Sequence, residues 1–491
     1  MNIRDLGRQL PYPIKLGIKY PIGVVPLPIR YGRVFRDTYR FLQESQWWSK
    51  EKLEDYQMLQ LKNLLDHAYK NVPYYRRVFD ERDLKPKDIQ SKEDLTKLPI
   101  LTKEIIRHNF SDLLAENIPK RELFEKQTSG STASPLSFFW HKSIEIPKEW
   151  SFIWTIFNIS GYQFNDKRVD LTWEHFNKRL WEYDPVERKL NLSAPYLVNN
   201  DVLYTYTELI RKHQPKVLKS IPSMLVALAD FMKNNEISIF ASIKVILCAS
   251  EQIYPWQREL IEKVFKCRLF CFYGQNEHVI LATQCEASDK YHVFPEYGIT
   301  EIIDSDDLAL KNELSMGRII GTGFNNYAMP FIRYEVGDMV AWSSEDCTCG
   351  RNYPLLQSIE GRENEYLVSG NGDLVPIITI PYSYIMKNVK QFQFYQDVKG
   401  KATLTLVPLP AFTKDDAESI SSSLRREVKN IEFTLEYTDS ISRTKSGKFK
   451  YIIQKIPVKF GSLPNQQPRP KGVVCRRPLK GACYSKSGKL N

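Results

Sequence analysis

The stretch from Lys126 to Trp140, KQTSGSTASPLSFFW, contains a hydroxyl-rich loop that runs into an apolar segment. Gly130 lets the backbone turn tightly, so that neighbouring N–H groups can converge on an anion. The hydroxyls beside it add donors that suit polyphosphate oxygens. An exposed turn between two strands has the same composition, because Ser, Gly and Pro also mark ordinary loops. The loop lacks the Gly-Lys-Ser/Thr ending of a Walker P-loop, which excludes that motif.

Four shorter segments downstream offer carboxylate, aromatic or cationic side chains beside turns. Each has an ordinary explanation as a surface Glu at a helix start, a core aromatic, a turn Asp or a solvated Lys. Together, in their order along the chain, they are more specific than any one of them alone. The residues are Tyr273, Gly274 and Glu277 in FYGQNEH, Asp338 in YEVGDMV, Arg362 and Asn364 in EGREN, and Lys448 in SRTKSGKF.

In order and rough spacing, these segments resemble the motifs of the adenylate-forming superfamily of acyl-CoA ligases. The upstream stretches LLDHAYKNVPYYRRVF and KLPILTKEII are typical of the branch that holds phenylacetate–CoA ligases and capsular polysaccharide biosynthesis proteins. The resemblance covers about residues 55 to 457. It implies an α/β fold, with a large N-terminal domain of layered sheets and helices and a small mobile α+β C-terminal domain.

The resemblance assigns the loop to the β- and γ-phosphates of ATP. One residue departs from the family pattern, since Ala133 stands where a second Gly is usual, and Ala does not tolerate positive φ. Glu277 matches the Mg²⁺ ligand, and hard oxygen ligands suit that ion. The phosphate-binding residues implied are Thr128, Ser129, Gly130, Ser131 and Thr132.

The remaining motif residues take nucleotide, hinge and catalytic roles by the same resemblance. Tyr273, followed by Gly274, matches the ring that stacks on adenine, and Asp338 matches the acceptor for the ribose hydroxyls. Arg362 lies at the domain junction and contacts the nucleotide, and Asn364 stands where the hinge often has Asp. Lys448 matches the catalytic Lys of the small domain, acting with Glu277.

Cys285, His292, Cys347 and Cys349 are soft or borderline ligands for tetrahedral Zn²⁺. Some relatives in the branch carry such a set. The Cys-x-Cys spacing is tighter than the usual Cys-x₂₋₄-Cys, so buried thiols with a loop His are an equal alternative. With four protein ligands a zinc site would be structural, because no coordination position stays open.

The elements that must position these residues follow from the apolar periodicity. Residues 50–72 repeat apolar positions at helical spacing, and from about 150 to 350 apolar runs alternate with helical segments as in an α/β sheet. Prolines punctuate the N-terminal residues and disfavour a long helix there. The predicted organisation is a basic Pro-rich leader at 1–45, a large ATP- and acid-binding domain at 46–362, a small domain at 363–457 and a disordered basic tail at 458–491.

The net charge of +11 over 491 residues resides at the two ends. Residues 459–491 carry +8 and residues 1–40 carry +6, which leaves −3 for the remainder. This distribution disfavours a nucleic-acid enzyme, which would carry a basic stripe across its folded surface. It fits either peripheral contact with an anionic membrane at its inner face or a merely solubilising tail.

The N-terminus has too many charges and prolines for a signal peptide, and no apolar run is long enough for a membrane span, so we expect a cytoplasmic protein. Its eight cysteines are then thiols or metal ligands rather than disulfides.

The predicted function is an AMP-forming ligase that uses ATP and Mg²⁺ to convert a carboxylic acid into an acyl-adenylate. The acyl group then passes to CoA or to another acceptor, such as a saccharide precursor in capsule biosynthesis. The acid is not readable, because Trp150, Trp154 and Phe157 are as suitable for a core as for its pocket. The alternative function is a catalytically silent scaffold at a membrane surface.

Overall fold

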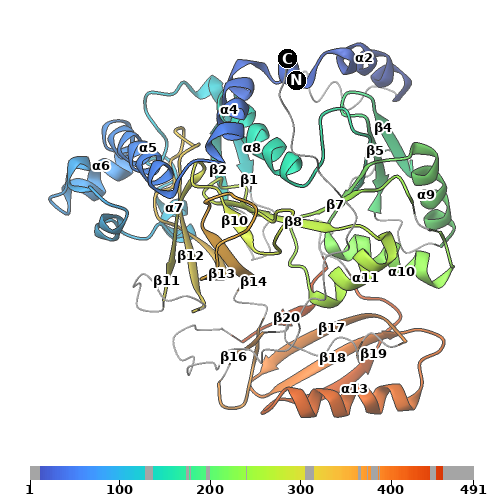
Figure 1. Cartoon of the computed structure of the whole chain (residues 1–491). Helices are drawn as coiled ribbons and strands as arrows, with labels where there is room; N and C mark the ends of the chain where they lie inside the picture. The colour runs from blue at the N-terminus through green and yellow to red at the C-terminus, as the bar shows by residue number, and fades with distance from the viewer. Residues whose placement is uncertain are drawn as a thin grey trace.

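Figure 1 shows a computed structural model of the chain. The structure describes residues 12–127, 136–172, 176, 179–194, 200–238, 240–304, 315–362, 366–372, 374–376, 385, 388–442 and 449–456. Within these ranges, no helix combines the length and the apolar character needed to cross a bilayer.

The N-terminal residues form helices, of which α4 belongs to the core, contrary to the predicted leader without a long helix. The last proline before α4 is Pro28, so the proline argument does not reach that helix. Phe35 and Leu42 of α4 are fully buried against α8. The elements are α2 (Tyr12–Val24), α3 (Leu27–Arg30), α4 (Gly32–Ser45), α5 (Lys50–Asn71), α6 (Pro73–Asp80), η1 (Pro86–Asp88), η2 (Glu93–Lys97), α7 (Lys103–His108) and η3 (Lys120–Glu122).

A twelve-stranded sheet forms the centre of the molecule, in the order β11-β12-β13-β14-β10-β9-β8-β7-β6-β3-β5-β4. The neighbouring strands β5, β3, β6, β7 and β8 pair parallel. Along the rest of this order, from β8 through β9, β10, β14, β13 and β12 to β11, neighbouring strands pair antiparallel. The bounds are β3 (Arg168–Thr172), β4 (Trp181–Asp184), β5 (Lys189–Ser193), β6 (Val217–Ser220), β7 (Val245–Cys248), β8 (Leu269–Gly274), β9 (Leu281–Thr283), β10 (Tyr291–Val293), β11 (Gly298–Ile303), β12 (Gly317–Gly323), β13 (Tyr334–Trp342) and β14 (Leu355–Arg362).

Helices cover both faces of the parallel half. Val245 and Leu247 of β7 point to the cluster shared with α4 and α8, and Ile246 points to the cluster of α9, α10 and α11. This alternation explains why the strand reads as a continuous apolar run. The helices are α8 (Glu145–Ile159), α9 (Asn200–His213), α10 (Pro222–Asn234) and α11 (Pro255–Phe265).

A hairpin of β1 (Leu123–Gln127) and β2 (Ser137–His141) flanks the hydroxyl-rich loop, with Gln127 opposite Ser137. Trp140 of β2 is buried, and Phe138 packs in the cluster that α5 and α6 share with β11 to β13. The apolar segment after the loop is therefore a core strand.

The C-terminal residues form a separate four-stranded sheet below the large part in Figure 1. Tyr451 packs on Tyr254 and accepts a hydrogen bond from Gln257 of α11 at 2.8 Å. The elements are β15 (Tyr366–Val368), β16 (Leu374–Pro376), β17 (Val389–Val398), β18 (Lys401–Pro408), α13 (Lys414–Glu427), β19 (Glu432–Tyr437) and β20 (Ile452–Gln454). The α/β class with a small C-terminal part is confirmed, and the four residue boundaries stay predictions.

Candidate active site

The carboxyl ends of β6, β7 and β8 meet at one edge of the sheet, where α/β proteins usually bind ligands. Tyr273 and Gly274 end β8, and Glu277 follows in the next turn. The same edge carries Glu251, which follows β7. Its carboxylate accepts hydrogen bonds from the Ser223 backbone N–H and hydroxyl, each at 3.0 Å.

Two hydrogen bonds tie the β8 turn to β13. The Tyr273 hydroxyl donates to Asp338 Oδ2 at 2.7 Å, and the Tyr334 hydroxyl donates to Glu277 Oε1 at 2.8 Å. Gly337 has a φ of +91° just where the β13–β14 register shifts, a conformation that strains other residues. The structure therefore brings Tyr273 and Glu277 of the β8 turn to β13, whose Asp338 lies 65 residues from Tyr273 in the sequence.

Several predicted site residues lie outside the described ranges. They are Thr128, Ser129, Gly130, Ser131, Thr132, Ala133, Asn364 and Lys448. Arg362 ends β14, where its backbone is in register with Asp338, and its side chain lies outside the described part. The first described residue after Lys448 is Phe449, whose backbone N–H donates to Glu251 Oε1 at 3.0 Å. That contact brings the C-terminal sheet to the carboxyl edge of the large sheet.

A buried polar group beside this edge escaped the sequence reasoning. The Trp140 ring stacks on His278 with centroids 4.0 Å apart, and His278 Nε2 lies 3.7 Å from Glu149 Oε2. The same Glu149 oxygen accepts a hydrogen bond from the Tyr297 hydroxyl at 2.7 Å. Among the described residues, buried Trp140 Nε1 and His278 Nδ1 have no hydrogen-bond partner.

Burial controls the protonation of this group. It raises the pKa of Glu149 to about 7, and together with Lys126 it lowers the pKa of His278 to about 3. Both groups are therefore held largely in their neutral forms in mildly acidic solution. A carboxylate on an otherwise apolar helix was the available signal, since Glu149 stands in EWSFIWTIF.

The aromatic residues considered for the acid pocket belong instead to the packing of α8. Trp154 and Phe157 are buried with Tyr162 in the cluster under α4, and Trp150 packs against the ring of Tyr31. Their helical spacing therefore reflects a core role.

The four predicted zinc ligands converge. Each offers one ligand atom, and the four atoms lie within 4.8 Å of one another. Cys285 Sγ lies 3.5 Å from Cys347 Sγ, and Cys349 Sγ lies 3.6 Å from His292 Nε2. Zinc bonds of about 2.3 Å to sulfur and about 2.0 Å to nitrogen place the corners of a tetrahedron about 3.8 Å and about 3.6 Å apart. The donor set fits Zn²⁺, and the zinc itself stays a prediction.

Two neighbouring features fix the turn that carries Cys347 and Cys349. Gly350 adopts a φ of +86°, and Arg351 donates from Nε to Gln46 Oε1 at 3.0 Å. The Arg351 guanidinium also lies 4.7 Å from the centroid of the Trp47 ring. The cluster thus joins β9, β10 and the β13–β14 connection to the start of α5.

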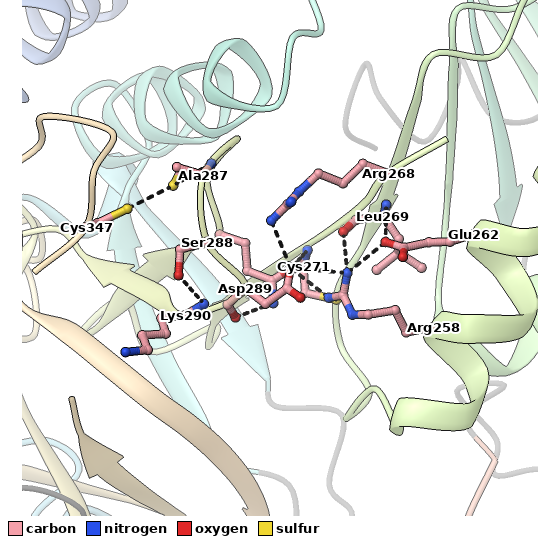
Figure 2. Close-up of polar contacts among 12 residues, drawn as sticks. Arg258, Glu262, Arg268, Leu269, Cys271, Ala287, Ser288, Asp289, Lys290 and Cys347 are labelled. Atoms are coloured by element: carbon pink, nitrogen blue, oxygen red, sulfur yellow. Dashed lines mark hydrogen bonds and ion pairs between the residues drawn. The ribbon is translucent and has the colours of Figure 1, made fainter. Parts of the chain in front are cut away.

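Figure 2 shows how the Cys285 loop is linked to α11 through charged side chains. Arg258 of α11 donates to Leu269 O at 2.8 Å and to Glu262 Oε1 at 3.0 Å. Arg268 donates to Asp289 Oδ1 at 2.8 Å, within the loop that follows Cys285. Arg258 and Arg268 both pair with Asp289, so this network restrains the loop that follows Cys285.

The proteins that this chain resembles are consistent with the arrangement of residues described above. Residues 367–455 match the family model of the CapK C-terminal domain. The chain is 22% identical over 449 residues to Protein CapK of Staphylococcus aureus, covering 88% of this chain and 95% of that protein. It is 25% identical over 357 residues to phenylacetate-coenzyme A ligase of Thermus thermophilus, covering 67% and 74%.

Among solved structures, 2-hydroxyisobutyryl-CoA ligase in the postadenylation state, in complex with 2-HIB-AMP, shares the fold. Its TM-score is 0.68 at 18% sequence identity, and the match covers 84% of this chain and 93% of the ligase. The resemblance found in the sequence motifs is confirmed by these matches. They show that the chain is similar over most of its length to CapK and to the phenylacetate-coenzyme A ligases, and that it shares the fold of an acyl-CoA ligase.

Proposed function

We propose that this chain is an AMP-forming ligase that activates a carboxylic acid with ATP and transfers the acyl group from the acyl-adenylate. The observation that carries the proposal is the pair of hydrogen bonds that joins Tyr273 to Asp338 and Glu277 to Tyr334 at the carboxyl edge of the sheet. The names of the relatives support it, since phenylacetate-coenzyme A ligase is among them.

In the proposed reaction, the acid's carboxylate attacks the α-phosphorus of ATP, and pyrophosphate leaves. Asp338 would accept hydrogen bonds from the ribose hydroxyls, because an ionised carboxylate is acceptor-only and suits a diol. Glu277 would hold Mg²⁺ through its carboxylate, and the bound ion would neutralise charge on the phosphate oxygens. The buried site and the Tyr334 hydroxyl orient this carboxylate, which is 7% exposed.

Lys448 is proposed to act in the first step only. An ammonium beside the α-phosphate neutralises charge that develops there as pyrophosphate departs. The contact between Phe449 and Glu251 supports this role, because Phe449 directly follows Lys448 and lies at the carboxyl edge of the large sheet. We call this edge the reaction edge. The loop residues Thr128 to Thr132 are proposed to hold the β- and γ-phosphates, and Arg362 and Asn364 keep their proposed nucleotide and hinge roles.

The acceptor is proposed to be CoA or a nucleophile of a surface-polysaccharide precursor. The chemical requirement is a thiol, amine or hydroxyl that displaces AMP from the acyl-adenylate. The first choice is supported by the ligase relatives, and the second by CapK, which matches over nearly its whole length. A structural Zn²⁺ at the Cys285, His292, Cys347 and Cys349 cluster is proposed to brace the large part, without a step in catalysis.

Pyrophosphate–ATP exchange against a panel of carboxylic acids tests the activity. We expect exchange that depends on one class of acid and that falls by about 10² or more in Glu277→Gln. CoA, aminosugars and buffer alone are then compared as acceptors by the release of AMP. Absence of exchange with every acid, while the purified protein unfolds cooperatively, would contradict the proposal and favour the silent scaffold.

A further inference from the structure

One face of α2 is docked against the β4–β5 hairpin. The Tyr12 hydroxyl accepts from the Tyr183 backbone N–H at 2.7 Å, and Lys19 forms an ion pair with Asp184 at 2.6 Å. A Cβ atom on Gly23 would lie 2.6 Å from the Pro185 carbonyl oxygen, so the helix backbone rests directly on the hairpin turn. These contacts determine which face of the helix points away from the protein.

The outward face carries large β-branched residues. Ile14, Ile18 and Ile22 follow each other at four-residue intervals and are 45 to 53% exposed. This spacing places them on one side of a helix. Val25 and Ile29 continue the series into α3 and are also exposed. We call these five residues the α2 stripe. Figure 1 places α2 at the outer margin of the large part, away from the C-terminal sheet.

Basic residues follow the α2 stripe along the chain. No acidic residue occurs between Leu6 and Arg36 in the sequence. On α4, Arg33, Arg36 and Arg40 are exposed at helical spacing, on the side opposite to the buried Phe35 and Leu42. Arg36 and Arg40 line a shallow pocket of about 340 Å³, together with Tyr39, Gln43 and Glu44. Asp37, which pairs with Arg33, and the exposed Glu44 offset part of this charge, so that α4 carries a net charge of +1.

We propose that the α2 stripe and the α4 arginines bind the surface of an anionic lipid bilayer. An apolar helical face beside cationic side chains is the pattern of helices that lie in the membrane interface. At 13 residues α2 is too short to cross a bilayer. The inference is independent of the proposed reaction.

Two other occupants fit the charges less well. Residues 457–491 are strongly basic and contain few large apolar side chains, so they complement neither the arginines nor the stripe. A second copy of the chain would bring the same arginines into apposition, and like charges repel. An anionic surface complements both parts.

Sedimentation of the full chain with vesicles of phosphatidylcholine, with or without phosphatidylserine, tests the proposal. We expect binding to depend on phosphatidylserine and to weaken with salt. Ile18→Glu/Ile22→Glu should reduce partitioning by about tenfold or more, because it removes apolar contact and adds like charge to an anionic surface. Leu59→Glu is the matched control, since Leu59 is exposed on α5, and it should leave partitioning unchanged.

Arg36→Gln/Arg40→Gln leaves α2 intact and still tests the proposal if the isoleucine variant disturbs the helix. It should reduce partitioning into phosphatidylserine vesicles by about tenfold and flatten the salt dependence. Equal binding to both vesicle types, or full binding by the two double variants, would overturn the proposal. A dimer in analytical ultracentrifugation that Ile18→Glu/Ile22→Glu dissociates would overturn it in favour of a second copy.

Discussion

The reaction edge and the cysteine–histidine cluster use the same large sheet in opposite ways. At the reaction edge, Asp338 and Glu277 each accept a hydrogen bond from a tyrosine hydroxyl, and carboxylates suit the ribose hydroxyls and the Mg²⁺ of the proposed reaction. In the cluster, one ligand atom from each of four residues lies within 4.8 Å of the others, from Cys285, His292, Cys347 and Cys349. Four protein donors fill a tetrahedron, so this site has no position for a substrate.

This difference indicates that the number of protein ligands distinguishes a catalytic site from a structural metal site. The cluster joins segments of the β9–β10 hairpin and the β13–β14 connection, and its donors are spaced for one ion. The reaction edge joins β8, β13 and, through Phe449, the C-terminal sheet. Loss of a ligand in the cluster should therefore lower the free energy of unfolding, and loss of a group at the reaction edge should lower the reaction rate.

Removal of a zinc ligand should give the largest effect on stability. Cys349→Ser leaves three donors, and we expect bound zinc to fall from about one per chain toward none, with a loss of about 4 kcal/mol or more in the free energy of unfolding. Elemental analysis and urea unfolding measure these quantities. Cys267→Ser is the control, because this partly buried thiol lies outside the cluster. Unchanged unfolding of metal-free wild-type protein would return the four residues to buried thiols and a loop His.

Lys448→Ala should give the largest effect on rate. We expect pyrophosphate exchange to fall by about 10², or about 2.7 kcal/mol, because one preorganised charge is lost in the first step. Transfer from a synthetic acyl-adenylate should stay near the wild-type rate, since pyrophosphate has already left. Lys450→Ala is the matched control, as Lys450 is exposed and has no motif role. If neither variant lowers exchange, Lys448 is not the catalytic lysine.

Glu149→Gln should change how stability depends on pH. The folded protein raises the pKa of Glu149 from its ordinary 4.5 to about 7, so it binds a proton more tightly than the unfolded chain. Its contribution is fully present below pH 4.5 and is lost as the pH rises through about 7. The variant should therefore be less sensitive to a rise from pH 5 to pH 8, by on the order of 2 kcal/mol in urea unfolding.

Glu187 provides a contrast of opposite sign. Burial acts against its charge, but Lys189 and Arg168 outweigh it and lower its pKa to about 2. Glu187→Gln should lose stability at neutral pH, where the wild-type carboxylate is charged and paired. A parallel pH response of the two variants would show that the Glu149 environment does not favour its neutral form.

Tyr334→Phe should give the smallest effect. It removes the hydroxyl that donates to Glu277, and a single hydrogen bond to a carboxylate contributes about 1 kcal/mol, or about fivefold in exchange. Tyr206→Phe removes a comparable hydroxyl that donates to Ser193 O at 2.7 Å, away from the reaction edge. We expect Tyr206→Phe to lower the free energy of unfolding and to leave pyrophosphate exchange unchanged. Equal loss of exchange in both would mean that Tyr334 acts only through folding.

The sequence by itself determined the features that depend on residue type and on spacing along the chain. Motif order identified the family, alternating apolar runs indicated an α/β sheet, and residue type nominated carboxylates and thiols as ligands. The proline argument failed for α4, because Phe35 and Leu42 bury a helix face that lies after the last proline of the segment. Helical spacing could not separate a substrate pocket from a core for Trp154, since both give the same pattern.

Only the tertiary structure decided which distant residues meet. The pairing of Tyr273 with Asp338 depends on the register of β8 and β13 in one sheet, and the meeting of Cys285 with Cys347 depends on two turns that approach across it. Burial likewise made Glu149 and His278 neutral neighbours, an effect that depends on surroundings that residue type does not encode. The outward direction of the α2 stripe was decided by the docking of Lys19 and Gly23 on the β4–β5 hairpin, because apolar spacing defines a face but not what covers it.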